Sequence, residues 1–458
     1  MNRPTDVNGD GQQQGLREIA NDISALGRDL LQAGRVKSAE VQFKKALGLV
    51  GDDVNAALGL GHCLHQLGRY AEALVLYDRL IRIAPQSAPA WNNRGNTLLE
   101  LSRHADAADS FYRVLEINPA LHDARVALAS CLQALGQVDL ALAACDMVLK
   151  AAPDHAEAHW NRSLLLLLKG DYDEGWREYE WRWQKRNFTS PRRNFPQPRW
   201  QGEPAAGKTI LIHAEQGFGD VLQFCRFVAL VADRGMRVIF ECHPPLVHLM
   251  HSLAGVEKIV PMGEPLTEFD LHLPLMSLPL IFDTTLDSVP AVVPYLAPPA
   301  DRLKTWQGRV PGDRRLKIGL CWAGKGYPDP LRSCPPHALA PLVAIPGIAW
   351  YSLQVGWQEV FPFPMNDLTG HVGDFADSAA LIAQLDLVIT IDTAVAHLAG
   401  ALGRPTWVML PHAPDWRWLL KREDTPWYPT MRLFRQNGPD TWQNVIQRIA
   451  RTLATEFP

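Results

Sequence analysis

Cysteine is scarce and unpaired in this sequence. The cysteines are scattered along 458 residues, their number is odd, and none forms a CxxC pair. Disulfide frameworks and structural zinc sites both rest on closely and regularly spaced cysteines. The spacing therefore predicts reduced thiols in a cytoplasmic protein, at Cys63, Cys131, Cys145, Cys225, Cys242, Cys321 and Cys334.

Long apolar runs and a strong net charge are also missing. A membrane-spanning helix needs about 20 apolar residues, whereas the run Leu164 to Leu168 ends at Lys169. Residues 1–15 lack the apolar core of a signal peptide. A net charge of −4 implies no general affinity for nucleic acid. The length predicts two or three globular domains.

The first part of the chain repeats itself every 34 residues. Pro85, Pro119 and Pro153 mark the period, which is that of tetratricopeptide (TPR) repeats. Small and aromatic residues recur in other phases, so that small residues let paired helices approach and an aromatic ring fills the space between them. These residues are Gly34, Gly68, Gly136 and Gly170; Ala39, Ala73, Ala107 and Ala141; Phe43, Tyr77, Phe111 and Tyr179; and Gly61 and Gly95, where the helices cross.

This period predicts an α-helical TPR solenoid over residues 20–187, after a disordered lead-in at 1–19. Its five repeats are expected to begin near residues 20, 54, 88, 122 and 156. The fifth repeat is unusually aromatic between Tyr172 and Trp183. Such a surface either docks the repeats onto the next domain or binds a peptide, and docking is favoured because large aromatic surfaces are rarely left bare. Residues 188–207, rich in proline and arginine, are expected to form an ordered linker.

Gly202 to Thr209 matches the Walker A pattern of nucleotide triphosphatases, but its context is inverted. A phosphate-binding loop follows a strand and opens a helix. Here a linker precedes the motif and an apolar strand, Thr209 to His213, follows it. ATP hydrolysis at this motif is therefore not expected.

The chain then shows a first α/β domain, predicted over residues 208–300. The strand at 209–213 leads into a glycine-rich turn with Gln216, Gly217 and Gly219, and Asp220 opens a helix expected over 221–234. A second strand is expected at 237–242. Asp220 is either a functional carboxylate or a favourable charge at a helix N-terminus.

Two other functions are disfavoured in this domain. Leu222 stands where a nicotinamide-binding fingerprint needs its third glycine, and no suitable acidic residue follows the second strand. A dehydrogenase is therefore not expected. His243, His248 and His251 lack the carboxylate or cysteine partners of a metal site, so no metal is predicted.

A second α/β domain is predicted over residues 312–458. Its strands are expected at 316–322, 349–354, 387–391 and 406–410, and its last helix at 441–455. Asp392 and Thr393 end the third strand and cap a helix expected over 394–402, where free N–H groups favour anions. Two such halves predict a cleft between them, with loop residues Lys325 and Gln354 beside it.

Three motifs together resemble the heptosyltransferase-like (family 9-like) GT-B glycosyltransferases, in a bacterial subgroup that carries TPR repeats. They are Gly217 to Asp220, Arg332 before Pro335, and Asp392 to Ala399, with the flanking phrases Pro414 to Trp418 and Trp427 to Pro429. The resemblance covers about residues 208–458. The layout is also similar to that of protein O-GlcNAc transferases.

The resemblance implies two Rossmann-like domains facing across a cleft, the first for the acceptor and the second for a nucleotide sugar. It implies that Asp220 is the general base. It implies that Arg332, where the family more usually has Lys, binds the donor diphosphate together with Asp392, Thr393, Ala394 and His397. Ala394 replaces the usual Gly of the family.

The chemistry expected of these residues is inverting transfer without a cofactor or a metal ion. A carboxylate accepts the proton of an acceptor hydroxyl, and cations with helix N–H groups stabilise the departing diphosphate. The acceptor is expected to be a hydroxyl, and the repeats suggest one on a protein held in their concave face. The alternative is a non-catalytic TPR scaffold with a degenerate GT-B module, favoured by Arg332, Ala394 and the altered loop Lys325 to Pro328.

Overall fold

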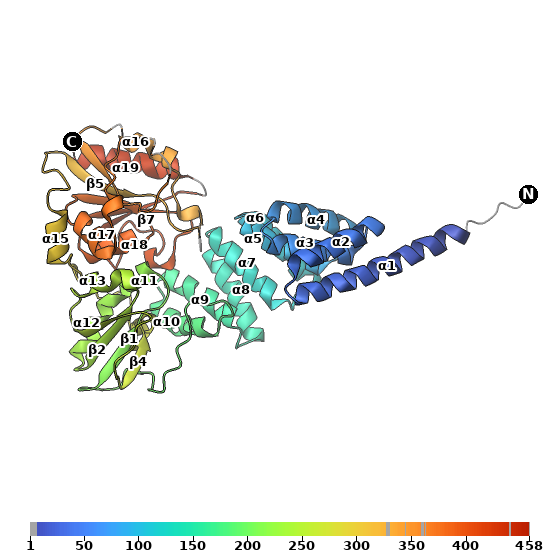
Figure 1. Cartoon of the computed structure of the whole chain (residues 1–458), viewed down its shortest axis with the longest axis horizontal. Helices are drawn as coiled ribbons and strands as arrows, with labels where there is room; N and C mark the ends of the chain where they lie inside the picture. Colours follow the sequence, from blue (N-terminus) through green and yellow to red (C-terminus); the bar gives the residue numbers. More distant parts are fainter. Residues whose placement is uncertain are drawn as a thin grey trace, which may run out of the picture. The chain divides into compact units, whose positions relative to one another are not determined.

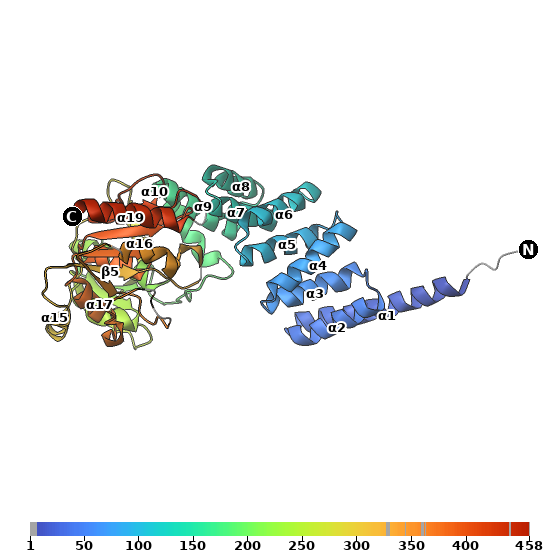
Figure 2. The ribbon, with the colours of Figure 1, turned by 90° about the horizontal axis from the view of Figure 1, so that it is seen from above.

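The computed structural model describes residues 7–326, 330–343, 345–358, 361, 363–438 and 441–457. The chain divides into two compact units, Met1–Arg162 and Ser163–Pro458. Among the described residues five helix pairs make up the repeats, and Figures 1 and 2 show α1 to α8 following one another within the first unit. They are α1 and α2 (Val7–Gln32, Val36–Leu49), α3 and α4 (Val54–Gln66, Tyr70–Ile83), α5 and α6 (Ala88–Glu100, His104–Ile117), α7 and α8 (His122–Ala134, Val138–Ala151), and α9 and α10 (Ala156–Lys169, Tyr172–Tyr179).

The predicted repeat starts at 54, 88, 122 and 156 coincide with helix starts, so the solenoid prediction is confirmed, whereas the start predicted near residue 20 lies inside α1. The lead-in prediction was wrong from residue 7 onward, because α1 begins at Val7. The segment holds Gln12, Gln13 and Gln14 and no proline after residue 4. Glutamine is a good helix former, so polarity alone did not mean disorder.

Glycines let the paired helices of the repeats touch. A Cβ atom on Gly95 of α5 would lie 2.8 Å from the ring of Phe111 in α6, and one on Gly61 of α3 would lie 2.6 Å from the ring of Tyr77 in α4. Both rings are buried. The predicted close crossing of the helices at these glycines is confirmed.

Helix α10 packs its aromatic face onto the α/β part of the second unit. The Trp176 ring lies 5.3 Å from that of Trp416, and its indole N–H donates to the Thr284 carbonyl at 3.1 Å. The Trp427 indole donates to the Tyr172 hydroxyl at 3.0 Å. The prediction that these aromatics dock onto the following domain is confirmed.

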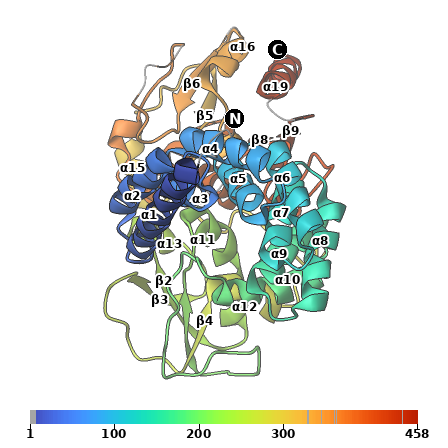
Figure 3. The same ribbon diagram turned by 90° about the vertical axis from the view of Figure 1, so that its right-hand side faces the viewer.

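The first α/β half contains a parallel sheet with strand order β3-β2-β1-β4. Figure 3 labels β2, β3 and β4 of this sheet. The strands are β1 (Thr209–His213), β2 (Arg237–Cys242), β3 (Val256–Pro261) and β4 (Leu271–Pro274). The single helix expected over 221–234 was wrong. It is divided into α11 (Phe218–Phe224), a 3-10 turn at Cys225–Phe227 and α12 (Val228–Asp233). Helices α13 (Val247–Met250) and α14 (Leu278–Ile281) complete this half.

The second half contains a five-stranded parallel sheet with the order β6-β5-β7-β8-β9. Its strands are β5 (Leu316–Cys321), β6 (Ile348–Ser352), β7 (Leu387–Ile391), β8 (Thr406–Leu410) and β9 (Met431–Arg435). Its helices are α15 (Ala300–Trp306), α16 (Ala340–Val343), α17 (Phe375–Ile382), α18 (Ala394–Ala401) and α19 (Trp442–Glu456). The two parallel sheets agree with the predicted pair of Rossmann-like domains.

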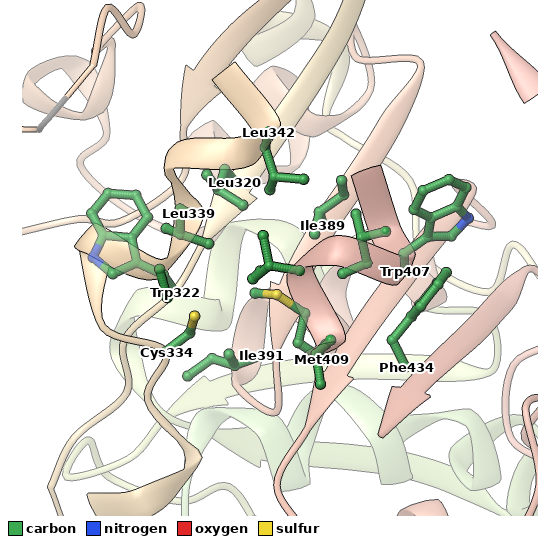
Figure 4. Packing of buried hydrophobic residues seen from close by; sticks show 14 of the residues in the cluster. Leu320, Trp322, Cys334, Leu339, Leu342, Ile389, Ile391, Trp407, Met409 and Phe434 are labelled. Atoms are coloured by element: carbon green, nitrogen blue, oxygen red, sulfur yellow. The ribbon is translucent and has the colours of Figure 1, made fainter. Parts of the chain in front are cut away.

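The core of the second half lies between its sheet and helices α16 and α19. Side chains of β5, β7 and β8, including Leu320, Ile389 and Met409, interdigitate with Leu339 and Leu342 (Figure 4). Helix α19 adds Val445, Ile446 and Ile449. Strand β7 is buried along its whole length, as its apolar run predicted.

The glycine crossings give a direct test of the repeat packing. We expect Gly95→Ala to destabilise the repeats by about 1–3 kcal/mol, because its methyl group would overlap the Phe111 ring. The matched control is Gly48→Ala in α2, where nothing lies within 4 Å of the added Cβ; alanine should stabilise that helix by up to about 1 kcal/mol. Urea unfolding followed by far-UV circular dichroism would measure both, and equal effects would contradict the packing.

Candidate functional site

The candidate site begins where the second sheet reverses its strand order. Strand β5 pairs with both β6 and β7, so the loops after β5 and β7 leave the sheet side by side. The Cys321 thiol lies 3.8 Å from the Thr393 hydroxyl across these loops. Ligands of open α/β sheets bind at such a switch point. The sequence placed its donor-side candidates on these two loops, and the structure brings them together.

Gln354 supports the loop after β5 from behind. Its side-chain oxygen accepts hydrogen bonds from the backbone N–H groups of Trp322, at 3.2 Å, and Ala323, at 2.9 Å. These bonds fix the course of the chain toward Gly324. Gln354 therefore fixes the loop after β5 through its side chain. The sequence predicted that it would lie beside the cleft.

Arg332 crosses the same loop at Gly324. A Cβ atom on Gly324 would lie 2.8 Å from Arg332 Nε, so glycine makes room for the guanidinium. Arg332 Nη2 donates to the carbonyl of Lys325 at 3.2 Å, and Nε has no partner among the described residues. The Lys325 side chain itself is exposed. Arg332 thus brings a cation with unused donor capacity to the switch point.

Helix α18 turns its N-terminus toward the same place. Thr393 is its N-cap, and its hydroxyl accepts from the N–H of Val395 at 3.3 Å. Within the described part of the chain, the N–H of Ala394 has no hydrogen-bond partner. Free N–H groups and the helix dipole at such an end favour an anion.

Asp392 lies next to this helix end and is largely buried, with its side chain 14% exposed. Its pKa is raised to about 6, chiefly by burial and also by the charge of Asp415, whereas Arg417 and Arg332 oppose the rise. An acid that takes up a proton near pH 6 repels an anion less strongly below that pH than above it.

His397 is buried inside α18 and is not positioned as a cation. Its Nδ1 lies 2.9 Å from the Tyr428 hydroxyl, and its ring stacks on Trp418 with 5.5 Å between centroids. Burial, with Arg417 and Arg226 nearby, lowers its pKa well below the usual value. Any contribution of His397 to phosphate binding would therefore come from a neutral imidazole.

Asp220 opens α11 on the first half. The N–H of Gly217 donates to Asp220 Oδ2 at 2.8 Å, and Arg417 of the second half donates to Oδ1. The Gln216 side chain points elsewhere, since its amide donates to the Tyr179 hydroxyl of α10 at 2.7 Å. Gln216 thus ties the turn to the last repeat.

The two halves meet where α11 approaches α18. A Cβ atom on Gly219 would lie 3.0 Å from the His397 ring and 3.7 Å from the Ala394 Cα. Gly219 therefore makes room for α18. The contact brings the helix of Asp220 against the anion-favouring end of α18.

Sequence reasoning missed the residues that complete this contact. Arg417 reaches Asp220 from a 3-10 turn at Trp416–Trp418, and Gln223 accepts from its Nε at 2.7 Å. Arg226 reaches back from the first half to the Trp427 carbonyl at 2.6 Å. The segments around Trp416 and Trp427 resemble a subgroup of the family, but a sequence pattern does not show which distant residues these segments contact.

Other candidate sites receive no support from the geometry. The Walker-like segment turns at Gly207, with φ of 80°, and enters β1 instead of a helix, as its context predicted. Among the described residues no three His, Cys, Asp or Glu side chains group as metal ligands. No helix in the described residues has the length and apolar character needed to cross a bilayer.

Comparison with protein families agrees with both parts of the architecture. Models described as tetratricopeptide repeat match residues 24–88, 76–108 and 98–165. A model described as glycosyltransferase family 9 (heptosyltransferase) matches residues 363–409, which include β7 and α18. The chain joins tetratricopeptide repeats to a domain that matches glycosyltransferase family 9.

A curated relative has a similar sequence over most of the chain. Protein FlbA of Caulobacter vibrioides (strain ATCC 19089 / CIP 103742 / CB 15) is 29% identical over 356 residues, 70% of this chain and 59% of that protein. The chain thus spans less than two thirds of this relative's length.

Solved TPR structures match a part of the chain. YrrB, described as a TPR protein with an unusual peptide-binding site, is 22% identical, with 35% of this chain and 82% of that chain covered and a TM-score of 0.32. MamA from Desulfovibrio magneticus RS-1 is 19% identical, with 35% and 91% covered and a TM-score of 0.34.

The raised pKa of Asp392 predicts that the free energy of unfolding of the second α/β half decreases as the pH rises. Its folded value of about 6 exceeds the unfolded value of 3.8, so the stabilising protonation is present below pH 4 and is lost as pH rises to 6. At 1.36 kcal/mol per pKa unit the full difference is about 3 kcal/mol, and we expect Asp392→Asn to gain most of it, roughly 2–3 kcal/mol, over the wild type between pH 4 and pH 7.5.

Urea unfolding of both proteins across this pH range measures the difference. Asp233→Asn, at an exposed position, is the control for a general effect of removing a carboxylate. A wild-type-to-Asp392→Asn difference that stays constant with pH would contradict the assignment.

Proposed function

We propose that this chain is a metal-independent, inverting glycosyltransferase that moves a sugar from a nucleoside-diphosphate sugar to an acceptor hydroxyl. One observation carries the proposal: the helix of Asp220 lies against the N-terminus of α18, where the charge of Arg332 acts on Asp392. A carboxylate on one half thus faces an anion-favouring end on the other half. The match of the α18 segment to glycosyltransferase family 9 supports the same chemistry.

In the proposed reaction the second half holds the donor. The diphosphate accepts hydrogen bonds from the Ala394 N–H and from Arg332, whose Nε is unpartnered within the described residues. As the bond between the anomeric carbon and the phosphate oxygen breaks, its electron pair leaves with the diphosphate. Donors that are already in place stabilise this growing charge without a metal ion.

The first half supplies the base. The acceptor oxygen bonds to the anomeric carbon from the side opposite the diphosphate, and Asp220 takes the hydroxyl proton. Attack from that side inverts the anomeric centre. The concave face of the repeats is proposed to bind a protein that carries the acceptor hydroxyl, because such a surface can hold an extended chain.

A second candidate is a scaffold protein whose α/β part no longer catalyses. Specific contacts favour it: Asp220 is already paired with Arg417, and His397 is buried against Tyr428. Ala394 and Arg332 also depart from the family pattern. Of the altered loop Lys325 to Pro328, Tyr327 and Pro328 lie outside the described residues.

Nucleotide binding separates the two candidates. We expect one nucleoside diphosphate among ADP, GDP, UDP and CDP to raise the unfolding free energy by about 2.7 kcal/mol at 100 times its Kd. Arg332→Ala should abolish most of that gain, because it removes the cation proposed to bind the diphosphate. Lys208→Ala is the matched control, since it changes only the Walker-like segment. Thermal unfolding without any nucleotide effect would favour the scaffold.

Deleting the repeats tests the proposed protein acceptor. A variant without residues 1–155 keeps α9 whole, since this helix begins at Ala156. We expect it to lose transfer to protein while it still hydrolyses the donor, because the donor-side residues all lie beyond the deletion. Radiolabelled donor would report both reactions. Loss of both would show that the repeats serve the fold of the α/β part instead.

A further inference from the structure

Arg417 forms a bridge from the second half to the carboxylate of the first. Its Nη2 donates to Asp220 Oδ1, its Nε to Gln223 Oε1 at 2.7 Å, and its Nη1 to Asp415 Oδ1 at 2.9 Å. Asp415 in turn accepts from the backbone N–H of Arg417 at 3.0 Å. Each arm of the guanidinium therefore has its own acceptor, two from α11 and one from its own loop.

The surroundings of this guanidinium leave it little freedom. The Arg417 side chain is 9% exposed, Gln223 is fully buried, and the Trp416 ring centroid lies 4.4 Å from the guanidinium carbon. A planar guanidinium offers its donors in fixed directions. Asp220 is thus held at Oδ2 by the Gly217 N–H and at Oδ1 by Arg417, while 18% of its side chain stays exposed.

We propose that Arg417 is the positioning residue of the base, so that the donor-side half completes the acceptor-side carboxylate. This inference rests on the proposed function. Each Asp220 oxygen retains lone-pair capacity for the proton of an acceptor hydroxyl. Arg417 itself transfers no proton. It fixes the direction of the carboxylate while the halves are together.

A purely structural role for Arg417 is the competing explanation, and Arg226 shows the difference. Arg226 also joins the halves, through the Trp427 carbonyl at 2.6 Å and the rings of Tyr295 and Tyr428, each 4.5 Å away. Within the described residues it meets no carboxylate. The halves therefore have a buried arginine that ties them together without touching Asp220, and this residue is a matched control.

Several other titratable groups face Asp220 or its partner. Tyr179 of α10 and His243 after β2 both respond to the Asp220 charge, and Asp415 and Asp392 lie near Arg417. Burial raises the pKa of Tyr179 and lowers that of His243. Asp392, with a pKa of about 6, titrates in the working range and needs its own control.

A thiol at position 220 tests the inference without any need for activity. All seven native cysteines are buried, so iodoacetamide should react selectively with Asp220→Cys. A neighbouring cation favours the thiolate, which is the reacting form. We expect Arg417→Gln, added to Asp220→Cys, to move the midpoint of the alkylation rate to higher pH by about one unit or more.

Arg226→Gln, added to Asp220→Cys, should leave the midpoint of the alkylation rate unchanged. Asp392→Asn, added to Asp220→Cys, shows how much the titration of Asp392 contributes to that midpoint. A midpoint that Arg417→Gln does not move, or that Arg226→Gln moves equally, would overturn the inference. Arg417→Lys is a second variant, in case the glutamine variant misfolds, because lysine keeps the positive charge. Its alkylation midpoint should lie between that of the protein with Arg417 and that of the Arg417→Gln variant.

Turnover then separates this inference from the proposed function. In chains with Asp220, Arg417→Gln should lower kcat and leave the donor KM unchanged, and Arg417→Lys should restore part of kcat. A wild type inactive with every nucleotide sugar would reject the proposed function, and the thiol midpoint would still decide the role of Arg417. A raised donor KM with an unchanged kcat would overturn the inference.

Discussion

The contact between α11 and α18 is the constraint on which the α/β region depends. Gly219 lets the two helices approach, and buried arginines secure the approach from both directions. Arg417 reaches a carboxylate, whereas Arg226 is satisfied by backbone carbonyls, a tyrosine hydroxyl and aromatic faces. Removing a buried charge from water is costly unless its donors are satisfied. The geometry of this contact is therefore strongly specified, and with it the placement of the loops after β1, β5 and β7.

The end of the last repeat also contacts the residues that lead to Asp220. Arg182, fully buried just after α10, makes paired hydrogen bonds to Glu215 at 2.8 and 2.9 Å and another to Ser277 at 2.7 Å. Glu215 follows β1 and immediately precedes the turn that leads to Asp220. Tyr179 reaches the next residue, Gln216. The end of the repeats thus shapes the turn before the candidate base.

Local and periodic features of the fold could be predicted from the sequence. The 34-residue period located the helix pairs, and the apolar runs located β1, β2, β5, β7 and β8. Asp220, Arg332 and the segment Asp392 to His397 could be brought together because each follows a strand of a parallel sheet. These features depend on neighbours in sequence or on a rule of topology.

Side-chain contacts between distant segments could not be predicted. Asp220 and Arg417 are 197 positions apart, and Arg226 and Trp427 are 201 apart. The 3-10 turn at Cys225–Phe227, which divides the expected helix, contains Arg226, and the apolar pattern around it gave no sign of a break. The burial of His397 likewise depends on Tyr428 and Trp418, which lie beyond the next strand.

The docking of α10 also determines where this chain can be cut. A fragment that starts at β1 would leave bare the rings of Phe224, Trp416 and Trp427 that α10 covers. It would also leave the buried carboxylate of Glu215 without its counter-ion. Such a fragment would expose an aromatic surface and a buried charge without its counter-ion, and both features favour aggregation. The smallest self-contained α/β piece therefore begins inside the last repeat, near Ser163, so the boundary between the folding units does not coincide with the boundary between the sequence motifs.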